Sequence, residues 1–390
     1  MKQNNGFTKT LFILTTFVTI NFCFFSFTRI PSALFQTNDV FEIDYDEIKT
    51  SSTLKAQGST LVDSEAIDCT DLLAQFRADK IQIATNMEGR DFRRSYVAIN
   101  LDTDKPFYVS THDPKIDSVR EQIIHDRRYY EFELTQRVVE IFERKSANGE
   151  ECIMLDVGAN IGWFSLVAAA HGASKVYSFE PNLQNSIRFC ESLSLNRWLH
   201  DDRSQDRVIP IAKGVGITEE MKTLYATSNM LDNPGSFTFK KEKAYFTNSI
   251  DENNNTVKEP LVIGDMQMTS LDLFAGRHGW FESQPCIALF KLDVEHFEFE
   301  VLQGAEKLLQ SHLIETIAME LKASYPKPRK SNIIKLLYSS GYEIYKHGRW
   351  MGPKYDVEQN YVNWKDLVED LHNQKYGENV MFRLKNEKQK

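Results

Sequence analysis

The feature that most constrains the fold is a short apolar run that leads straight into a glycine-rich turn. Cys152–Val157 reads CIMLDV, and the turn that follows carries Gly158 and Gly162. The next stretch, residues 161–170, is apolar on nearly all sides, as a buried helix is. A buried strand that passes through glycines into a helix is typical of a doubly wound α/β fold, in which ligands bind at the carboxyl ends of the strands.

The same alternation of strand and helix extends on both sides of this turn. Further strands are predicted at 95–100, 107–110, Lys175–Phe179, 208–212, 287–292, 314–321, 342–346 and 380–384. Helices are predicted at 130–142 with an end near Gly149, at Leu183–Leu195, at 297–310 and at 333–338, closed by Gly341. Apolar strands that alternate with helices predict an α/β fold with a doubly wound, mostly parallel sheet covered on both faces.

The N-terminus predicts a membrane segment. Lys2 and Lys9 precede residues 11–27, which carry no charge. The run is about as long as the shortest membrane-spanning helices, and its basic flank favours a cytoplasmic N-terminus with the rest of the chain translocated. Residues 1–35 are therefore interpreted as a signal-anchor, with the catalytic domain in the lumen of the secretory pathway. A cleaved signal peptide is the alternative, since the small residues Ser32 and Ala33 follow, and the protein would then be secreted.

Polar sequence separates this segment from the domain and also interrupts the domain. Residues 36–94 form a polar stem and lead-in, and residues 95–390 form the α/β domain. The polar stretch at 229–260 is too long for an ordinary connection, so it is interpreted as a flap over the site or a disordered insert. Asn254 and Thr256 form a glycosylation acceptor there, which suits a lumenal domain.

The cysteines and the net charge say little about the function beyond which partners and metals to expect. Cys23 lies in the apolar run, and the four others, Cys69, Cys152, Cys190 and Cys286, permit three pairings or free thiols. None has the spacing of a metal site, the histidines form no ligand set, and no metal is predicted. A formal net charge of −9 argues against a broad nucleic-acid-binding surface, so nucleic acid is not expected as a partner.

The glycine turn favours a ligand without phosphate. A P-loop requires lysine after its glycines, whereas Trp163 follows Gly162. A dinucleotide site has the pattern G-x-G-x-x-G, whereas this chain has G-x-x-x-G preceded by Asp156, whose carboxylate would repel a pyrophosphate. S-adenosylmethionine carries an ammonium, a sulfonium and a ribose, so an acid beside the turn suits it.

Glu180 supports the same site. It follows the second predicted strand of the sheet, where an acid can accept hydrogen bonds from both ribose hydroxyls. NAD sites place an acid there too, so Glu180 does not decide between the cofactors. The alternative for both Asp156 and Glu180 is a solvated turn residue or a helix cap.

Lys291, Asp293 and Glu295 alternate along the end of another predicted strand, so they share a face if the strand continues that far. Asp293 or Glu295 is a candidate to orient or deprotonate an acceptor hydroxyl, and His296 is a further candidate to take the proton. The alternative is that these carboxylates cap the helix predicted at 297–310.

Three stretches resemble the FkbM-type methyltransferase family: LDVGANIGWFSLVAAAHGA from Leu155, VYSFEPN from Val176 and FKLDVEHFEFEVLQGAEKLL from Phe290. The similarity covers roughly residues 96–343. It implies a class I methyltransferase fold of Rossmann-like architecture, S-adenosylmethionine as cofactor and usually O-methylation. Carried over by position, Asp156, Gly158, Asn160 and Gly162 would line the methionine side, and Glu180 would hold the ribose.

Two departures from the family pattern stand out. His296 replaces the usual glycine, and residues 213–216 lack the acid that often helps to place the adenine. The expected function is an S-adenosylmethionine-dependent methyltransferase that modifies a hydroxyl of a glycan, a lipid or a small molecule. The alternatives are an NAD-dependent oxidoreductase and a non-catalytic lumenal binding protein on a methyltransferase scaffold.

Overall fold

The computed structural model describes residues 41–42, 65–78, 96–100, 105–112, 130–227, 236–250, 256–322, 324–348, 364–373 and 378–385. The predicted membrane segment and the predicted glycosylation acceptor Asn254 lie outside these residues. Among the described helices, none combines the length and the apolar character needed to cross a bilayer.

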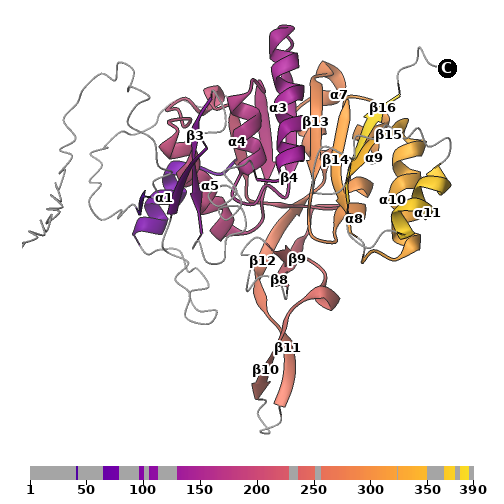
Figure 1. Cartoon of the computed structure of the whole chain (residues 1–390). Helices are drawn as coiled ribbons and strands as arrows, with labels where there is room; N and C mark the ends of the chain where they lie inside the picture. Colours follow the sequence, from indigo (N-terminus) through magenta and orange to yellow (C-terminus); the bar gives the residue numbers. More distant parts are fainter. Residues whose placement is uncertain are drawn as a thin grey trace, which may run out of the picture. The chain divides into compact units, whose positions relative to one another are not determined.

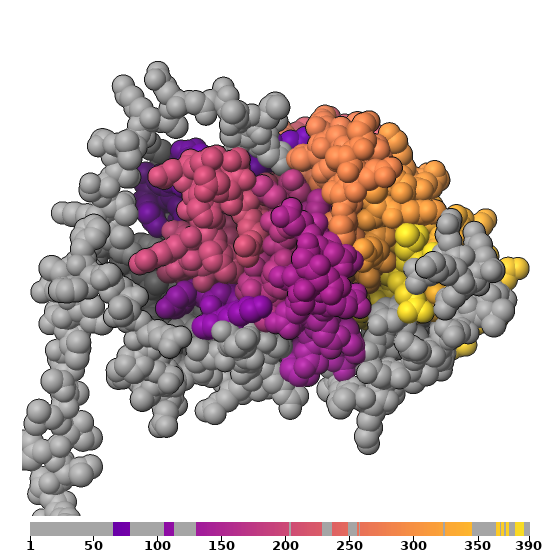
Figure 2. All heavy atoms as spheres, turned by 90° about the horizontal axis from the view of Figure 1, so that it is seen from above, coloured from indigo at the N-terminus to yellow at the C-terminus, as the bar shows by residue number. Residues whose placement is uncertain are grey.

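The main sheet has seven strands in the order β15-β16-β14-β13-β4-β5-β6. Strands β6, β5, β4, β13 and β14 are parallel, whereas β16 runs antiparallel to both of its neighbours. The bounds are β4 Cys152–Val157, β5 Lys175–Phe179, β6 Val208–Ile211, β13 Cys286–Leu292, β14 Thr316–Leu321, β15 Tyr342–Gly348 and β16 Glu378–Leu384. Seen from above, the sequence colours follow this order across the molecule, from pink through magenta and orange to yellow (Figure 2). The predicted mostly parallel α/β sheet is confirmed.

Helices cover both faces of this sheet, because each central strand is apolar on both sides. In β4, Cys152 and Met154 belong to one core, and Ile153, Leu155 and Val157 belong to the other. The first core packs under α1 Cys69–Arg77, α3 Phe132–Ala147, α4 Trp163–Ala170 and α5 Leu183–Leu195. The second packs under α6 Leu271–Arg277, α7 Trp280–Ser283, α8 Glu298–Gln303, α9 Glu306–Gln310, α10 Lys327–Ser339 and α11 Trp364–Asn373 (Figure 1).

The helix predicted at 297–310 is in fact two helices, α8 and α9, separated at Gly304. A Cβ atom on Gly304 would lie 1.8 Å from the carbonyl oxygen of Gly216. The backbones at Gly304 and Gly216 pack directly against each other, and the helix is interrupted there. The apolar residues nevertheless keep their helical spacing on both sides of Gly304. The pattern of apolar residues alone could not show this contact.

The polar stretch predicted as a flap or a disordered insert contains β-structure in its described part. Its strand β9 Phe237–Thr238 joins three strands that flank the stretch, β7 Gly214–Val215, β8 Met221–Ala226 and β12 Val262–Thr269, in a sheet of the order β7-β12-β8-β9. Its strands β10 Phe246–Ile250 and β11 Thr256–Pro260 form a hairpin that continues away from the main sheet (Figure 1).

The lead-in contributes β1 Phe41–Glu42 and α1. β1 pairs with β2 Tyr96–Asn100, and β2 pairs with β3 Phe107–Thr111, so that the three strands form a separate antiparallel sheet.

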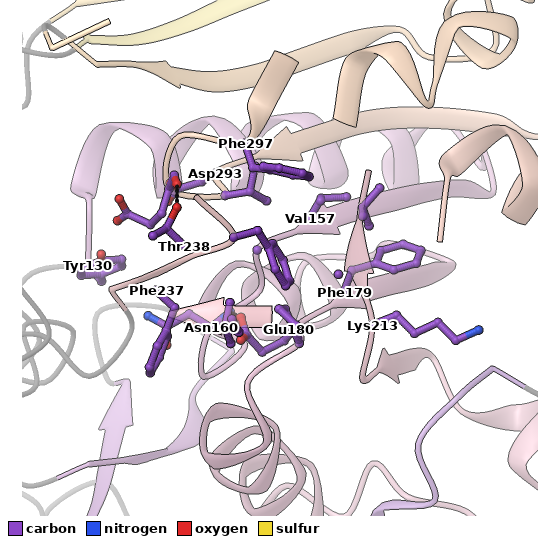
Figure 3. Close-up of a pocket in the computed structure, with 18 residues that line it drawn as sticks. Tyr130, Val157, Asn160, Phe179, Glu180, Lys213, Phe237, Thr238, Asp293 and Phe297 are labelled. Atoms are coloured by element: carbon purple, nitrogen blue, oxygen red, sulfur yellow. Dashed lines mark hydrogen bonds between the residues drawn. The ribbon is translucent and has the colours of Figure 1, made fainter. Parts of the chain in front are cut away.

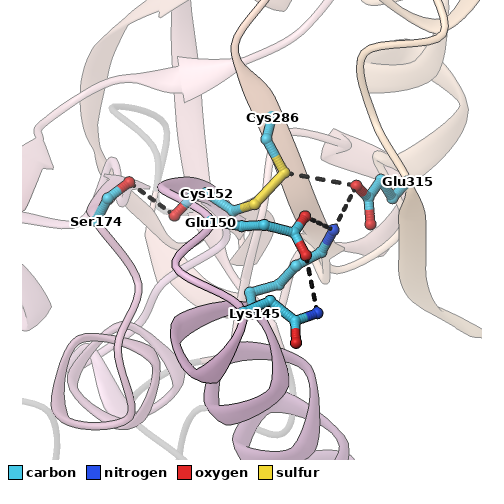
Figure 4. The surroundings of a disulfide bond; sticks show 7 residues. Lys145, Glu150, Cys152, Ser174, Cys286 and Glu315 are labelled. Carbon is cyan, nitrogen blue, oxygen red and sulfur yellow. Dashed lines mark hydrogen bonds and ion pairs between the residues drawn. A yellow bond between two sulfur atoms is a disulfide. The ribbon is translucent and has the colours of Figure 1, made fainter.

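Two disulfides resolve the question that the cysteine spacing left open. Cys69 of α1 is joined to Cys190 of α5, and Cys152 of β4 is joined to Cys286 of β13. The second bond connects paired residues of the two central strands, with Lys145 and Glu315 beside it (Figure 4). The bonds span 121 and 134 residues of sequence, so each restricts the unfolded chain strongly.

Replacement of Cys69 and Cys190 by serine should lower the free energy of unfolding by about 2–4 kcal/mol, because the unfolded chain regains the freedom that a long closed loop removes. Denaturant titration measures the change. Reductant should lower the midpoint of the native protein, whereas it should leave a variant without all four cysteines unchanged. An unchanged midpoint of the native protein in reductant would contradict both disulfides.

Candidate functional site

The candidate site is a cleft at the point where the strand order reverses. β4 has β5 on one side and β13 on the other, and the chain leaves both β4 and β13 at the same edge of the sheet. The cleft holds about 730 Å³ of open space. Its lining consists of Tyr130, Val157, Gly158, Asn160, Phe179, Glu180, Pro181, Lys213, Gly214, Val215, Leu224, Phe237, Thr238, Phe239, Asp293, Val294, Glu295 and Phe297 (Figure 3).

Lys291 joins the ends of β4 and β13 beneath this cleft. Its side chain is 5% exposed, and its Nζ lies 3.4 Å from Oδ1 of Asp156 and donates a 2.7 Å hydrogen bond to the carbonyl oxygen of Gly158. Burial opposes the charge, but the carboxylates of Asp156 and Asp293 outweigh it and raise the pKa of Lys291 above its usual range. A charged ammonium therefore fixes the first residue of the glycine turn.

Asp156 lies under the turn and outside the cleft lining. It is fully buried, and its Oδ2 accepts a 2.6 Å hydrogen bond from the hydroxyl of Ser165 in α4. Its contacts with Ser165 and Lys291 hold the turn in place. It is neither a solvated turn residue nor a helix cap, and its predicted direct contact with the cofactor stays a prediction.

Gly158 and Gly162 both adopt left-handed backbone conformations, with φ of +82° and +87°. A Cβ atom on Gly158 would lie 1.8 Å from the carbonyl oxygen of Asp293, and one on Gly162 would lie 2.2 Å from the ring of Phe189. Gly158 lines the cleft, whereas Gly162 begins α4 behind it. The turn needs glycine at both positions, because any side chain would collide with a packed neighbour.

Glu180 and Asn160 meet at the centre of the cleft. Glu180 accepts 2.8 Å hydrogen bonds from the backbone N–H groups of Asn160 and Asn182, one on each carboxylate oxygen. Burial raises the pKa of Glu180 to about 7. Asn160 has a φ of +53°, and its buried Oδ1 has no hydrogen-bond partner. A carboxylate for hydroxyl donors beside a free acceptor for an ammonium fits the ribose and the amino group of S-adenosylmethionine.

The far end of the cleft is largely apolar. Phe179, Pro181 and Val215 line it, together with Lys213, whose Nζ lies 3.5 Å from a carboxylate oxygen of Glu65. These apolar side chains form a wall that can hold the adenine ring by packing, so an acid at 213–216 is not required there. In Figure 3, Lys213 lies at one end of the cleft, and Asp293, Thr238 and Tyr130 lie toward the other.

Asp293 and Glu295 both line the cleft, although β13 ends at Leu292, so the alternation of a continued strand is not what places them there. Oε2 of Glu295 accepts a 2.7 Å hydrogen bond from Lys322 of the β14 edge, whereas the nearest cation to Asp293 is Lys291, at 3.9 Å. Helix α8 begins with Phe297 as its N-cap residue and without a side-chain capping bond. The alternative in which these carboxylates cap the helix is therefore not what the structure shows.

His296 does not join them in the cleft lining. Its ring lies 5.2 Å from the ring of Tyr325, and its backbone oxygen accepts a hydrogen bond from Arg329. Burial and the neighbouring cations, Lys322 first among them, lower its pKa to about 4. The left-handed backbone at Glu295 and His296, with φ of +46° and +74°, turns the histidine away where the family usually has glycine. The structure gives no contact that supports His296 as a proton acceptor.

Four aromatic residues line the end of the cleft near Asp293 and were not predicted as site residues from the sequence. Tyr130 precedes α3, Phe237 and Phe239 lie in and beside β9, and Phe297 precedes α8. The phenylalanines at 237 and 239 were the available signal, because two aromatic residues in a polar stretch predict a short buried edge. They could not be assigned to the site without knowledge of how the insert folds back.

Among the described residues, one group has the geometry of a metal site, namely Glu150, Cys152 and Cys286. The two cysteines are joined in a disulfide, so their sulfur atoms are not available as thiolate ligands. This group also lies at the opposite ends of β4 and β13 from the cleft.

Comparison with known families gives one match. Residues 156–344 match the model of the methyltransferase FkbM domain. No curated protein matches the chain.

Several solved structures match the chain at low similarity. Methyltransferase FkbM from Methylobacillus flagellatus KT is 15% identical with a TM-score of 0.33, and the match covers 60% of this chain and 43% of that one. A putative SAM-dependent methyltransferase from Streptococcus mutans is 11% identical with a TM-score of 0.35, over 74% and 55% of the two chains. This chain thus spans about half the length of these two proteins. Scores this low add nothing to what the family match shows.

Replacement of Lys291 by methionine should weaken the binding of S-adenosylhomocysteine about 10- to 100-fold, because the turn loses a charged hydrogen-bond donor. Calorimetric titration measures the affinity, and K105M removes an exposed lysine as the control. The melting temperature of K291M should also be lower than that of the double variant D156N/K291M, because K291M alone leaves the buried Asp156 without its counter-charge. Affinity equal to that of the native protein would contradict the role of Lys291.

Binding of S-adenosylhomocysteine should weaken as the pH falls from 8 to 6. Ribose hydroxyls need an ionised acceptor, and the carboxylate of Glu180 is progressively protonated below its raised pKa of about 7. Below that pH the affinity should fall by up to about tenfold per pH unit. The variant E180Q should bind more weakly and with a flatter pH profile, whereas an unchanged profile would show that Glu180 is not the titrating group.

Proposed function

We propose that this chain is an S-adenosylmethionine-dependent methyltransferase that methylates a hydroxyl group of an acceptor, and the match of residues 156–344 to the methyltransferase FkbM domain supports this. The observation that carries this proposal is the placement of Asp293 in the cleft lining beside the glycine turn. The match to a methyltransferase family argues against the alternative of an NAD-dependent oxidoreductase. The non-catalytic alternative gains no support, because the turn, Asn160 and Glu180 are all in place.

The residues of the turn hold the cofactor in this proposal. The Oδ1 atom of Asn160 accepts a hydrogen bond from the amino group, and Glu180 accepts from the ribose hydroxyls. Asp156 acts from below through Lys291, whose Nζ holds the carbonyl of Gly158. The cofactor supplies a methyl group on a positively charged sulfur, which is already a good leaving group, so the protein mainly has to align the acceptor with it.

Asp293 is the best placed group to receive the proton of the acceptor hydroxyl. Its side chain is 35% exposed, whereas Glu295 is 26% exposed and is held by Lys322. The cofactor would supply the methyl group, and the Asp293 carboxylate would take the proton of the acceptor hydroxyl and pass it to solvent. Glu295 orients the acceptor, and the products are the methyl ether and S-adenosylhomocysteine.

The domain is proposed to act in the lumen of the secretory pathway. Disulfides persist in oxidising compartments, and this chain has two that join elements far apart in the sequence. The apolar run at 11–27 and its basic flank support a signal-anchor, with cleavage and secretion as the alternative. The acidic net charge of −9 supports an acceptor other than nucleic acid.

Replacement of Asp293 by asparagine should lower turnover about 10²- to 10⁴-fold with little change in the affinity for S-adenosylhomocysteine, since the proton acceptor is lost and the cofactor contacts remain. E295Q should raise the KM of the acceptor more than it lowers kcat. Transfer of labelled methyl groups into fractionated extract measures turnover. Full turnover in D293N would contradict the role of Asp293, and no transfer by the native protein would contradict the function.

A further inference from the structure

The cleft has a cofactor end, lined by the glycine turn, Glu180 and the apolar wall, and an acceptor end around Asp293. The two ends differ in the side chains that line them. Beyond the turn, Glu180 and the apolar wall, the remaining lining has four aromatic residues, two carboxylates, a hydroxyl and two aliphatic side chains: Tyr130, Phe237, Phe239, Phe297, Asp293, Glu295, Thr238, Leu224 and Val294. In Figure 3, Asp293, Thr238, Tyr130 and Phe237 lie on the same side of the cleft. We propose that this end binds a neutral sugar ring and that a hydroxyl of a carbohydrate is the acceptor. This inference rests on the proposed function.

Phe237, Phe239 and Phe297 form an aromatic wall of the cleft, which is held rigidly enough to act as a binding surface. The Thr238 hydroxyl donates a 3.0 Å hydrogen bond to the backbone oxygen of Glu295, so β9 is tied to the loop after β13. Two residues further on, Lys240 donates a 2.8 Å hydrogen bond to Glu300, which also accepts from Arg329. The rings of Phe239 and Phe297 pack 5.5 Å apart. The insert thus forms a wall that is in place before the acceptor arrives.

The combination of side chains suits a sugar. The face of an aromatic ring is electron-rich and attracts the C–H groups that cover one face of a sugar ring. Carboxylates accept hydrogen bonds from hydroxyls, and a second carboxylate beside the first can engage the neighbouring hydroxyl. The hydroxyl of Thr238 donates to the backbone oxygen of Glu295, so the polar and the aromatic surfaces keep a fixed position relative to each other.

The carboxylates near Asp293 disfavour an anionic acceptor. Asp293 lies close enough to Glu295 and Glu320 for its charge to contribute to the raised pKa of each. Lys322 is bound to both of these glutamates, and Lys240, Lys243 and Arg329 lie near enough to His296 to help lower its pKa. A neutral acceptor adds no charge to this group, whereas a further carboxylate or phosphate would be repelled by Asp293.

The cleft also disfavours a long aliphatic acceptor. Burial of an alkyl chain against Asp293 and Glu295 would remove water from two carboxylates without replacing its hydrogen bonds. A sugar ring replaces them with its own hydroxyls.

The test uses the full-length chain and follows the formation of S-adenosylhomocysteine with five acceptors. These are the neutral 4-nitrophenyl β-glucoside, β-galactoside and α-mannoside, the anionic 4-nitrophenyl glucuronide, and n-octanol. At least one neutral glycoside should be methylated, and the glucuronide and octanol should react at least about tenfold more slowly. A glycoprotein with neutral glycans, assayed beside the free glycosides, separates a polymer-bound sugar from a free one.

Variants of the aromatic wall test the site itself. F237A and F239A should raise the KM of the glycoside about tenfold and leave the affinity for S-adenosylhomocysteine unchanged. F246A is the matched control, because Phe246 is exposed on the β10–β11 hairpin and does not line the cleft. If F237A and F239A behave like F246A, the aromatic wall does not bind the acceptor and the inference fails.

Two negative results have different meanings. A preference for the glucuronide or octanol, or methylation only of extract components that survive glycosidase digestion, overturns the carbohydrate acceptor and leaves the methyltransferase intact. Binding of S-adenosylhomocysteine without methyl transfer to any acceptor or extract fraction overturns the proposed function as well.

Discussion

The buried ammonium of Lys291 is the contact on which the site depends. It lies among carboxylates beneath the cleft and donates to the carbonyl of Gly158, so it connects the strand that ends in the cofactor turn with the strand that ends in Asp293. A buried charge is costly unless it is paired and hydrogen-bonded, and here both conditions are met. The glycine turn and Asp293 are thereby held in one frame, because their loops share a single cation.

The opposite ends of the same two strands are joined covalently. Cys152 and Cys286 are paired neighbours in β4 and β13, and their disulfide fixes the register of the strands at the end away from the cleft. Register matters here, because a slip of one residue would turn Lys291 toward the other face of the sheet. A disulfide at one end and an ion pair at the other thus hold the central strands at the alignment that the site needs.

The local sequence predicted most of the main sheet, because each of these strands is apolar over its own length. β4, β5 and α5 have the bounds predicted from the pattern, and Glu180 and Asp293 lie at strand ends that line one cleft. Prediction failed where a contact between distant segments decides the structure. The break at Gly304 depends on Gly216, and the direction of His296 depends on two left-handed residues. The pairing of Cys69 with Cys190 depends on the packing of α1 against α5.

By itself, the sequence determined the order of strands and helices, the glycine turn and the acids at the strand ends, because each of these is encoded within a few neighbouring residues. Only the tertiary structure decided that Asp156 acts from beneath the turn and that His296 lies outside the cleft. It also decided that Phe237 and Phe239 form a wall of the cleft. The reason is physical: whether a side chain faces a ligand depends on the segments that pack around it, and those come from parts of the chain far away in sequence.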